Sequence, residues 1–242
     1  FLIGVSKLPL SDLSLTTNGQ LLLKKAAVLE ESGIKRINIS LDTLNPLKFK
    51  QIARGGDLET VLAGIAKMQA LGIKIKINMV PMRNQNLSDI LRLLDFSLER
   101  DIELRFIELM RMGHLLHDSS YQQEFLSMQE ILDEIATVYS FQRADAPFDS
   151  TAVRFHIPDK GYFGIIANES EPFCTACTRL RISSDGYLYG CLSSSRRQSL
   201  AELLELPSHL VLPRLQRLLV SALGDKQLSF QGETTVMKFI GG

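Results

Sequence analysis

The sequence predicts an α/β protein, with a partial barrel of parallel strands followed by an α+β region. Through the first 110 residues, segments with the alternating pattern of strands are separated by segments with helical periodicity. Strands separated by helices in this way form parallel sheets with right-handed crossovers. After residue 110 the pattern changes to hairpins and helices around three cysteines. We therefore expect a first domain over residues 1–115 and a second over 116–242.

The first half contains four predicted strands, at residues 13–17, 37–42, 73–80 and 104–109. Helical patterns lie between them at about residues 20–32, after Asn45-Pro46, at 58–71 and over Leu87, Leu91, Leu94 and Leu98. Gly33 and Gly72 stand where the C-terminal glycine of a helix belongs.

Each of these strands has one apolar face and one polar face. The polar positions are Ser14, Thr16, Asn38, Ser40, Asp42, Lys74, Lys76, Asn78, Glu103 and Arg105. Buried parallel strands usually read as continuous apolar runs, and a closed eight-stranded barrel fills its interior with branched apolar side chains. The polar positions therefore favour an open or partial barrel around a polar ligand. The alternative is a sheet with helices on one side only and solvent on the other.

The second half carries shorter elements. They are an amphipathic helix at 128–138, two strand-like pieces at 153–157 and 162–166, a cysteine hairpin, a short helix near 199–206, a helix after Pro213 and a tail ending in Gly241-Gly242.

The composition is that of an ordinary soluble protein, with 45% hydrophobic and 22% charged residues and a formal net charge of zero. Nothing in this balance favours nucleic acid or an anionic membrane as a partner. No apolar run approaches the roughly 20 residues that span a bilayer. Three cysteines without a signal peptide favour reduced thiols, and we expect a cytoplasmic location. The chain begins with Phe1, which we interpret as an internal position of a longer protein.

The three cysteines follow the spacing of a single metal site. Cys174 and Cys177 form a C-x-x-C pair, and Cys191 follows after thirteen residues. Between them, Asp185-Gly186 indicates a two-residue hairpin turn in which both residues have positive φ. Such a turn would place Cys191 opposite about Leu180, so that all three sulfurs converge.

Iron and zinc both remain open as the metal. A zinc site would need a fourth ligand, and none of the histidines His114, His117, His156 and His209 stands in a ligand pattern near the hairpin. A four-iron cluster needs only three thiolates, because one iron can take another ligand. Iron is favoured, while unrelated buried thiols are the third alternative.

Two arginines, Arg179 and Arg181, flank Leu180 and share one face of the expected strand. The planar guanidinium suits bidentate binding of phosphate. With Lys76 and Arg105, these arginines indicate an anion site. Alternatively, they are ordinary surface charges.

Several strings resemble one known family. They are Thr16-Thr17-Asn18-Gly19, residues 37–42, 76–78 and 104–110, Phe173 to Arg181, residues 184–186, Cys191 and Ile240-Gly241-Gly242. In order and content they are similar to the molybdenum cofactor biosynthesis protein A family, the radical S-adenosylmethionine GTP 3′,8-cyclases. The resemblance extends over essentially the whole chain.

The resemblance implies a set of site residues. Cys174, Cys177 and Cys191 would hold a C-terminal 4Fe-4S cluster, and Ser40 and Met110 would contact S-adenosylmethionine. The implied GTP contacts are Thr16, Lys76, Arg105, Arg179, Leu180 and Arg181, and the Gly241-Gly242 tail would reach into the active site. Simple alternation puts Met110 and Arg105 on opposite faces, so the strand is expected to end or bulge before Met110.

The resemblance also implies the reaction, a lyase step of molybdopterin biosynthesis that converts GTP to cyclic 3′,8-dihydro-GTP. It implies S-adenosylmethionine, a second 4Fe-4S cluster, an electron donor, a homodimer and a downstream pterin synthase step. The family's N-terminal C-x-x-x-C-x-x-C and G-G-E-P motifs are absent. We therefore expect a TIM-type barrel lacking its first strands and a chain unable to generate the radical alone. The alternatives are another radical enzyme with an auxiliary cluster, or a noncatalytic zinc-binding module.

Overall fold

The computed structural model describes residues 1–148 and 150–230, and the chain divides into two compact units. The first unit comprises Phe1–Glu108, Leu126–Ala146 and Ala152–Ile166, and the second contains the remaining segments. The units interleave along the sequence, and the division at residue 115 expected from the sequence stays a prediction.

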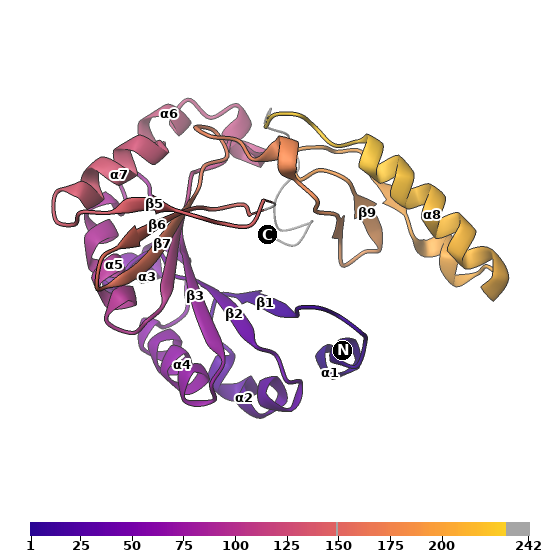
Figure 1. The fold of residues 1–242 in the computed structure, drawn as a ribbon, viewed down its shortest axis with the longest axis horizontal. Coiled ribbons are helices and arrows are strands. Elements are labelled where there is room, and N and C mark those ends of the chain that lie inside the picture. Colours follow the sequence, from indigo (N-terminus) through magenta and orange to yellow (C-terminus); the bar gives the residue numbers. More distant parts are fainter. Residues whose placement is uncertain (149, 231–242) are drawn as a thin grey trace. The chain divides into compact units, whose positions relative to one another are not determined.

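The first unit is built on a seven-stranded sheet with the order β1-β2-β3-β4-β7-β6-β5 (Figure 1). Its first four strands and β7 pair in parallel, while β7, β6 and β5 pair antiparallel. The strands are β1 (Ser14–Thr17), β2 (Arg36–Ser40), β3 (Lys74–Met79), β4 (Glu103–Ile107), β5 (Gln142–Ala144), β6 (Val153–Ile157) and β7 (Gly161–Ile166). This parallel-dominated sheet confirms the predicted mixed α/β class.

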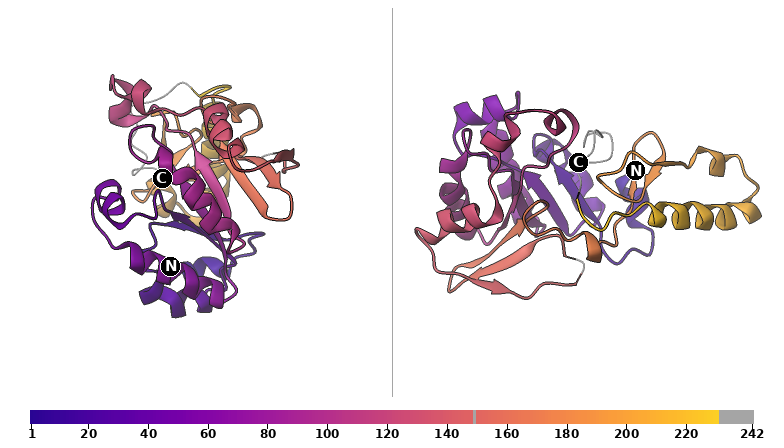
Figure 2. Two further views of the ribbon diagram at one scale, coloured as in Figure 1. Left: turned by 90° about the vertical axis from the view of Figure 1, so that its left-hand side faces the viewer. Right: turned by 90° about the horizontal axis from the view of Figure 1, so that it is seen from above.

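Helices connect the parallel strands and cover one face of this sheet (Figure 1). They are α2 (Leu22–Glu31), α3 (Pro46–Ile52), α4 (Leu58–Ala70), and the short η1 (Leu87–Asp89) with α5 (Ile90–Leu98). Helix α7 (Met128–Ala136) follows β4 and packs against α5, and the short α1 (Leu2–Ser6) precedes β1. The left view of Figure 2 looks onto several of these helices. Three of them begin at a side-chain cap: Asn45 for α3, Asp57 for α4 and a Ser127–Glu130 capping box for α7.

The core of the first unit lies between the helices and the apolar face of the sheet. Alternate strand residues such as Ile37, Ile77 and Phe106 are fully buried there. Phe106 and Phe163 meet edge to face, with ring centroids 6.3 Å apart. Because strand side chains alternate, this packing directs the polar positions to the opposite face.

The second unit has a three-stranded antiparallel sheet of β8 (Arg181–Ile182), β9 (Tyr187–Tyr189) and β10 (Gln198–Ser199). Helix α8 (Ser208–Gly224) packs on it through Leu188, Leu218 and Ala222 (Figure 1). The other helical turns are η2 (Gly113–Leu116), α6 (Tyr121–Glu124), η3 (Cys174–Ala176) and η4 (Ala201–Leu204). Among the described residues, no helix combines the length and apolarity needed to cross a membrane.

Two details of the second unit differ from the sequence prediction. Helix α8 begins at Ser208 after Pro207, so Pro213 lies inside the helix and does not mark its start. In the cysteine hairpin, Gly186 has a φ of 83° but Asp185 is not left-handed. The Gly186 N–H donates to Ser183 O at 3.0 Å, which makes a three-residue loop ending in a left-handed glycine. The two-residue turn was therefore wrong.

The extra loop residue shifts the register of the hairpin by one position. Arg181 pairs with Tyr189, and Ile182 with Leu188. If this register is continued, Cys191 stands opposite Arg179 and not opposite Leu180. Cys191 thus stands opposite a residue two positions after Cys177, whereas the predicted turn placed it opposite a residue three positions after.

Candidate functional site

The polar face of the first unit carries two rows of side chains across neighbouring strands. In one row Thr16, Asn38, Lys76 and Glu103 are successive register partners. In the next row the successive partners are Ser40, Asn78, Arg105, Gly164 and Arg154. The sheet thus brings together Thr16, Lys76 and Arg105, three of the residues that the family resemblance singled out.

Arg105 lies at the centre of this face and is fixed by two amides. Its Nε donates to Asn78 Oδ1 at 2.9 Å and its Nη2 donates to Asn38 Oδ1 at 2.9 Å. Asn38 in turn donates to Thr16 Oγ1 at 3.2 Å. A guanidinium has five N–H donors, so these contacts orient the group and leave donors for an anionic ligand. Burial lowers the pKa of Arg105 from its usual value, and the nearby charge of Glu103 opposes the shift.

Glu103 is the acidic member of this face and is shared by two cations. Its Oε1 lies 2.7 Å from Lys76 Nζ, and its Oε2 lies 3.1 Å from Arg154 Nη2. The Arg154 guanidinium also lies 3.8 Å from the centre of the Tyr162 ring. A cavity of about 940 Å³ opens beside these side chains, lined also by Lys35, Arg36, Lys74, Arg100 and Lys160. The surroundings of the cavity are therefore predominantly cationic.

Ser40 opens into a second, smaller cavity of about 390 Å³, which Asn18, Asp42 and Arg54 also line. Asp42 accepts a hydrogen bond from Val80 N at 2.8 Å. Burial raises the pKa of Asp42, although the Val80 hydrogen bond opposes the rise.

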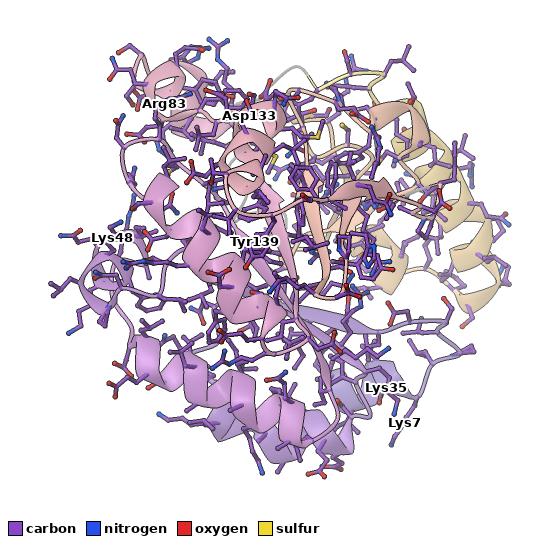
Figure 3. The ribbon with its side chains drawn as sticks, turned by 60° about the vertical axis from the view of Figure 1, so that its left-hand side comes forward. Lys7, Lys35, Lys48, Arg83, Asp133 and Tyr139 are labelled. Carbon is purple, nitrogen blue, oxygen red and sulfur yellow. The ribbon has the colours of Figure 1, made fainter. Side chains whose placement is uncertain are left out.

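The loop after β3 is tied to the ends of the strands by a buried amide that the sequence reasoning missed. Asn86 Nδ2 donates to Asp42 O at 3.0 Å and to Val80 O at 3.1 Å. Beside it, Lys48, labelled in Figure 3, donates to the buried Asp89 at 2.7 Å. The contacts of Asn86 with Asp42 and of Lys48 with Asp89 join residues 44 and 41 positions apart, so no local sequence pattern indicates them.

The three cysteines belong to the second unit, and all three are free and partly exposed. Cys174 and Cys177 lie on one tight turn, in which Cys177 N donates to Cys174 O at 3.2 Å. Burial raises the pKa of Cys174, and the charges of Cys191 and Cys177 raise it further. The three thiols are therefore close enough to interact electrostatically. Within residues 1–148 and 150–230, however, no three His, Cys, Asp or Glu side chains have the geometry of a metal site.

Cys177 lies beside two cationic side chains, those of Lys226 and Arg179. Burial by itself raises its pKa, but the Arg179 backbone hydrogen bond, Lys226 and the Arg179 side chain outweigh it, so that the pKa is lowered. Lys226 Nζ lies 3.7 Å from Cys177 Sγ. Sequence reasoning missed Lys226, since it stands after α8 in no recognisable motif.

Arg179 and Arg181 lie on one side of their strand, and Leu180 lies on the other. Leu180 packs against the small core of Leu188, Leu218 and Ala222. Burial lowers the pKa of Arg181, and the neighbouring charges of Cys177 and Cys191 only partly oppose this shift. Arg179 stacks over the Phe173 ring at 5.4 Å. Both guanidiniums therefore lie near the thiols, as alternation along the strand indicated.

The remaining residues of the predicted site have different positions. Strand β4 ends at Ile107, before Met110, as the expected change of face required. Met110 belongs to the second unit, whereas Ser40 belongs to the first. Gly241 and Gly242 lie outside the described residues.

Comparison with known proteins gives two family matches. A family described as Molybdenum Cofactor Synthesis C matches residues 102–231, and the Radical SAM superfamily matches residues 3–97.

Curated relatives named GTP 3′,8-cyclase are similar over most of the chain. The protein of Listeria monocytogenes is 39% identical over 194 residues, which are 78% of this chain and 58% of the relative. The protein of Campylobacter fetus is 38% identical over 191 residues, 79% of this chain and 58% of its own. The protein of Synechocystis is 37% identical over 189 residues, which are 78% of this chain and 57% of the relative. The chain thus spans somewhat more than half the length of these relatives.

Proposed function

Because this chain belongs to the molybdenum cofactor synthesis C family, we propose that it acts as part of a GTP 3′,8-cyclase of molybdenum cofactor biosynthesis. The reaction converts GTP to cyclic 3′,8-dihydro-GTP. The fold is then a section of a radical S-adenosylmethionine barrel without its first strands, followed by the cysteine-bearing region.

The observation that carries this proposal is the placement of Arg105. Its two side-chain hydrogen bonds within the described chain go to the neutral amides of Asn78 and Asn38. The positive charge is thus oriented but not paired directly with a carboxylate. Lys76 lies in the adjacent row. In this proposal the GTP contacts are Thr16, Lys76, Arg105, Arg179, Leu180 and Arg181.

The cysteines fit the proposed C-terminal 4Fe-4S cluster by their chemistry. Three free thiols influence one another electrostatically, and one of them has a lowered pKa. Thiolates are the ligands that iron–sulfur clusters require. Cys174, Cys177 and Cys191 hold the cluster, while Ser40 and Met110 orient S-adenosylmethionine. When bound, S-adenosylmethionine and its own cluster supply the radical chemistry.

The chain's own residues bind and orient the substrate in this proposal. The amides Asn38 and Asn78 hold the Arg105 fork in one orientation, so that little freedom is lost when an anion binds. The proposal extends to an electron donor, a homodimer, a downstream pterin synthase step and a cytoplasmic location.

The test is anaerobic reconstitution of the chain with iron and sulfide, followed by titration with GTP. We expect a brown protein with broad visible absorbance, a spectrum that changes on addition of GTP, and a smaller change with ATP. A colourless protein holding stoichiometric zinc would contradict the proposal and favour a zinc-binding module. Equal spectral responses to GTP and ATP would contradict the assignment of the substrate.

A further inference from the structure

The segment that follows α8 returns to the cysteine hairpin of the same unit. Lys226 Nζ donates to Arg179 O at 2.6 Å and to Gly190 O at 3.2 Å, and it lies 3.7 Å from Cys177 Sγ. The three N–H donors of the ammonium thus have three acceptors. Arg179 follows Cys177 by two positions, and Gly190 directly precedes Cys191. One ammonium therefore joins the chain leaving Cys177 to the chain entering Cys191.

The next residue, Gln227, binds the backbone that follows Cys191. Gln227 Nε2 donates to Ser193 O at 2.9 Å, and Ser193 Oγ donates to Gln227 Oε1 at 2.9 Å. The Ser193 hydroxyl also lies 3.5 Å from Cys191 Sγ. Lys226 and Gln227 thus hold the backbone on both sides of this cysteine.

Helix α8 provides a firm base for these contacts. Leu218 and Ala222 are buried against Leu188 of the hairpin. At Gly190 the helix approaches so closely that an added Cβ would lie 1.6 Å from Ala222 O. The end of α8 is therefore in close contact with the residue that precedes Cys191, and Lys226 follows the helix by two residues.

We propose that Lys226 is a positioning residue for the cysteine ligands, which joins the backbone after Cys177 to the backbone before Cys191 and so restricts how far the two cysteines can move apart. The inference rests on the proposed function, since that function supplies the cluster. The ammonium also places a positive charge beside thiolates that repel one another. Loss of a group that orients metal ligands typically costs about 10- to 100-fold in metal affinity.

The test compares Lys226→Met with Lys226→Arg and with Arg196→Gln. Arg196 is a matched control, because its exposed guanidinium pairs at 3.3 Å with Asp225, the residue before Lys226. Each chain is reconstituted anaerobically with iron and sulfide. Iron per chain, visible absorbance and the rate of iron loss to a chelator are measured, and far-ultraviolet circular dichroism monitors folding.

We expect Lys226→Met to lose iron about 10- to 100-fold faster than the unchanged chain. Lys226→Arg keeps the charge and the donors, so it should restore much of the retention, and Arg196→Gln should match the unchanged chain. Equal retention in Lys226→Met would overturn the positioning role, as would equal losses in Lys226→Met and Arg196→Gln. An unchanged chain that takes up no iron would instead overturn the proposed cluster, and the inference with it.

Discussion

At the scale of single residues, the amide-held Arg105 is the group on which GTP binding should depend most. Charge-assisted hydrogen bonds contribute about 1.5–3 kcal/mol each, so Arg105→Gln should weaken GTP binding by about 10- to 150-fold. Arg105→Lys keeps the charge but loses the planar fork, so its affinity for GTP should lie between those of the unchanged chain and Arg105→Gln. Calorimetric titration of each chain with GTP under anaerobic conditions gives the affinities.

Arg83 offers the control for this substitution. Its guanidinium pairs with Glu130 in the same unit, at a partly exposed position labelled in Figure 3. Arg83→Gln should leave GTP affinity unchanged. If it weakens binding as much as Arg105→Gln does, the loss reflects total charge and not the polar face of the sheet.

Asp42 gives a prediction about pH. Burial raises its pKa above 3.8 in the folded protein, so the folded state holds this proton more tightly than the unfolded state does. The contribution to stability is therefore full below pH 3.8 and is lost as pH rises through the folded pKa. Asp42→Asn keeps an oxygen for the Val80 N–H and avoids the buried charge. Urea unfolding should show that Asp42→Asn is more stable than the unchanged chain at pH 7, and the difference in the free energy of unfolding should shrink towards pH 4. A difference that does not change with pH would contradict the raised pKa of Asp42.

At the scale of elements, the contact between α8 and the hairpin should be the most sensitive backbone position of the second unit. A methyl group at Gly190 would meet the carbonyl of Ala222, so the helix must shift. Overpacking of this kind costs about 1–3 kcal/mol, and Gly190→Ala should also increase iron loss because Cys191 is adjacent. Gly186→Ala is the comparison, since nothing lies within 4 Å and only the left-handed φ of 83° is strained, at about 1 kcal/mol.

Urea unfolding and iron retention distinguish the two glycines. Gly186→Ala should lose stability while it retains iron at the unchanged rate. Parallel losses of iron in both variants would mean that general destabilisation, and not the approach of α8, controls the cysteine geometry.

The elements that sequence predicted well are those governed by local patterns. Alternation and helical periodicity located β1 to β4 and their connecting helices to within a few residues. The prediction of the hairpin loop failed because Asp185-Gly186 is compatible with both a two-residue and a three-residue loop. The backbone conformation, the strand register and the hydrogen bond from Gly186 N to Ser183 O identify the three-residue loop. Lys226 could not be found in this way, because its partners Arg179 and Gly190 are backbone carbonyls 47 and 36 positions away.

At the scale of the whole molecule, the sheet of the first unit depends on residues far beyond its fourth strand. Strand β7 pairs with β4 along its length, and Phe163 of β7 is fully buried beside Phe106. Helix α7 packs against α5, and a hydrogen bond from Met128 N to Glu108 Oε1 at 2.7 Å joins the first residue of the helix to the residue that follows β4. A fragment of residues 1–115 would therefore expose the β4 edge and part of the core.

We expect the fragment of residues 1–115 to lack a cooperative urea transition and to be digested rapidly by protease, whereas residues 1–166 should unfold cooperatively. Exposing the buried aromatic side chains alone forfeits about 3 kcal/mol or more, a large share of the stability of a small domain. The unpaired edge of β4 would also favour aggregation. Circular dichroism against urea, with limited proteolysis, makes the comparison. If residues 1–115 unfold as sharply as residues 1–166, the later strands are an addition to a sheet that is complete without them, and the sequence boundary near residue 115 is also a folding boundary.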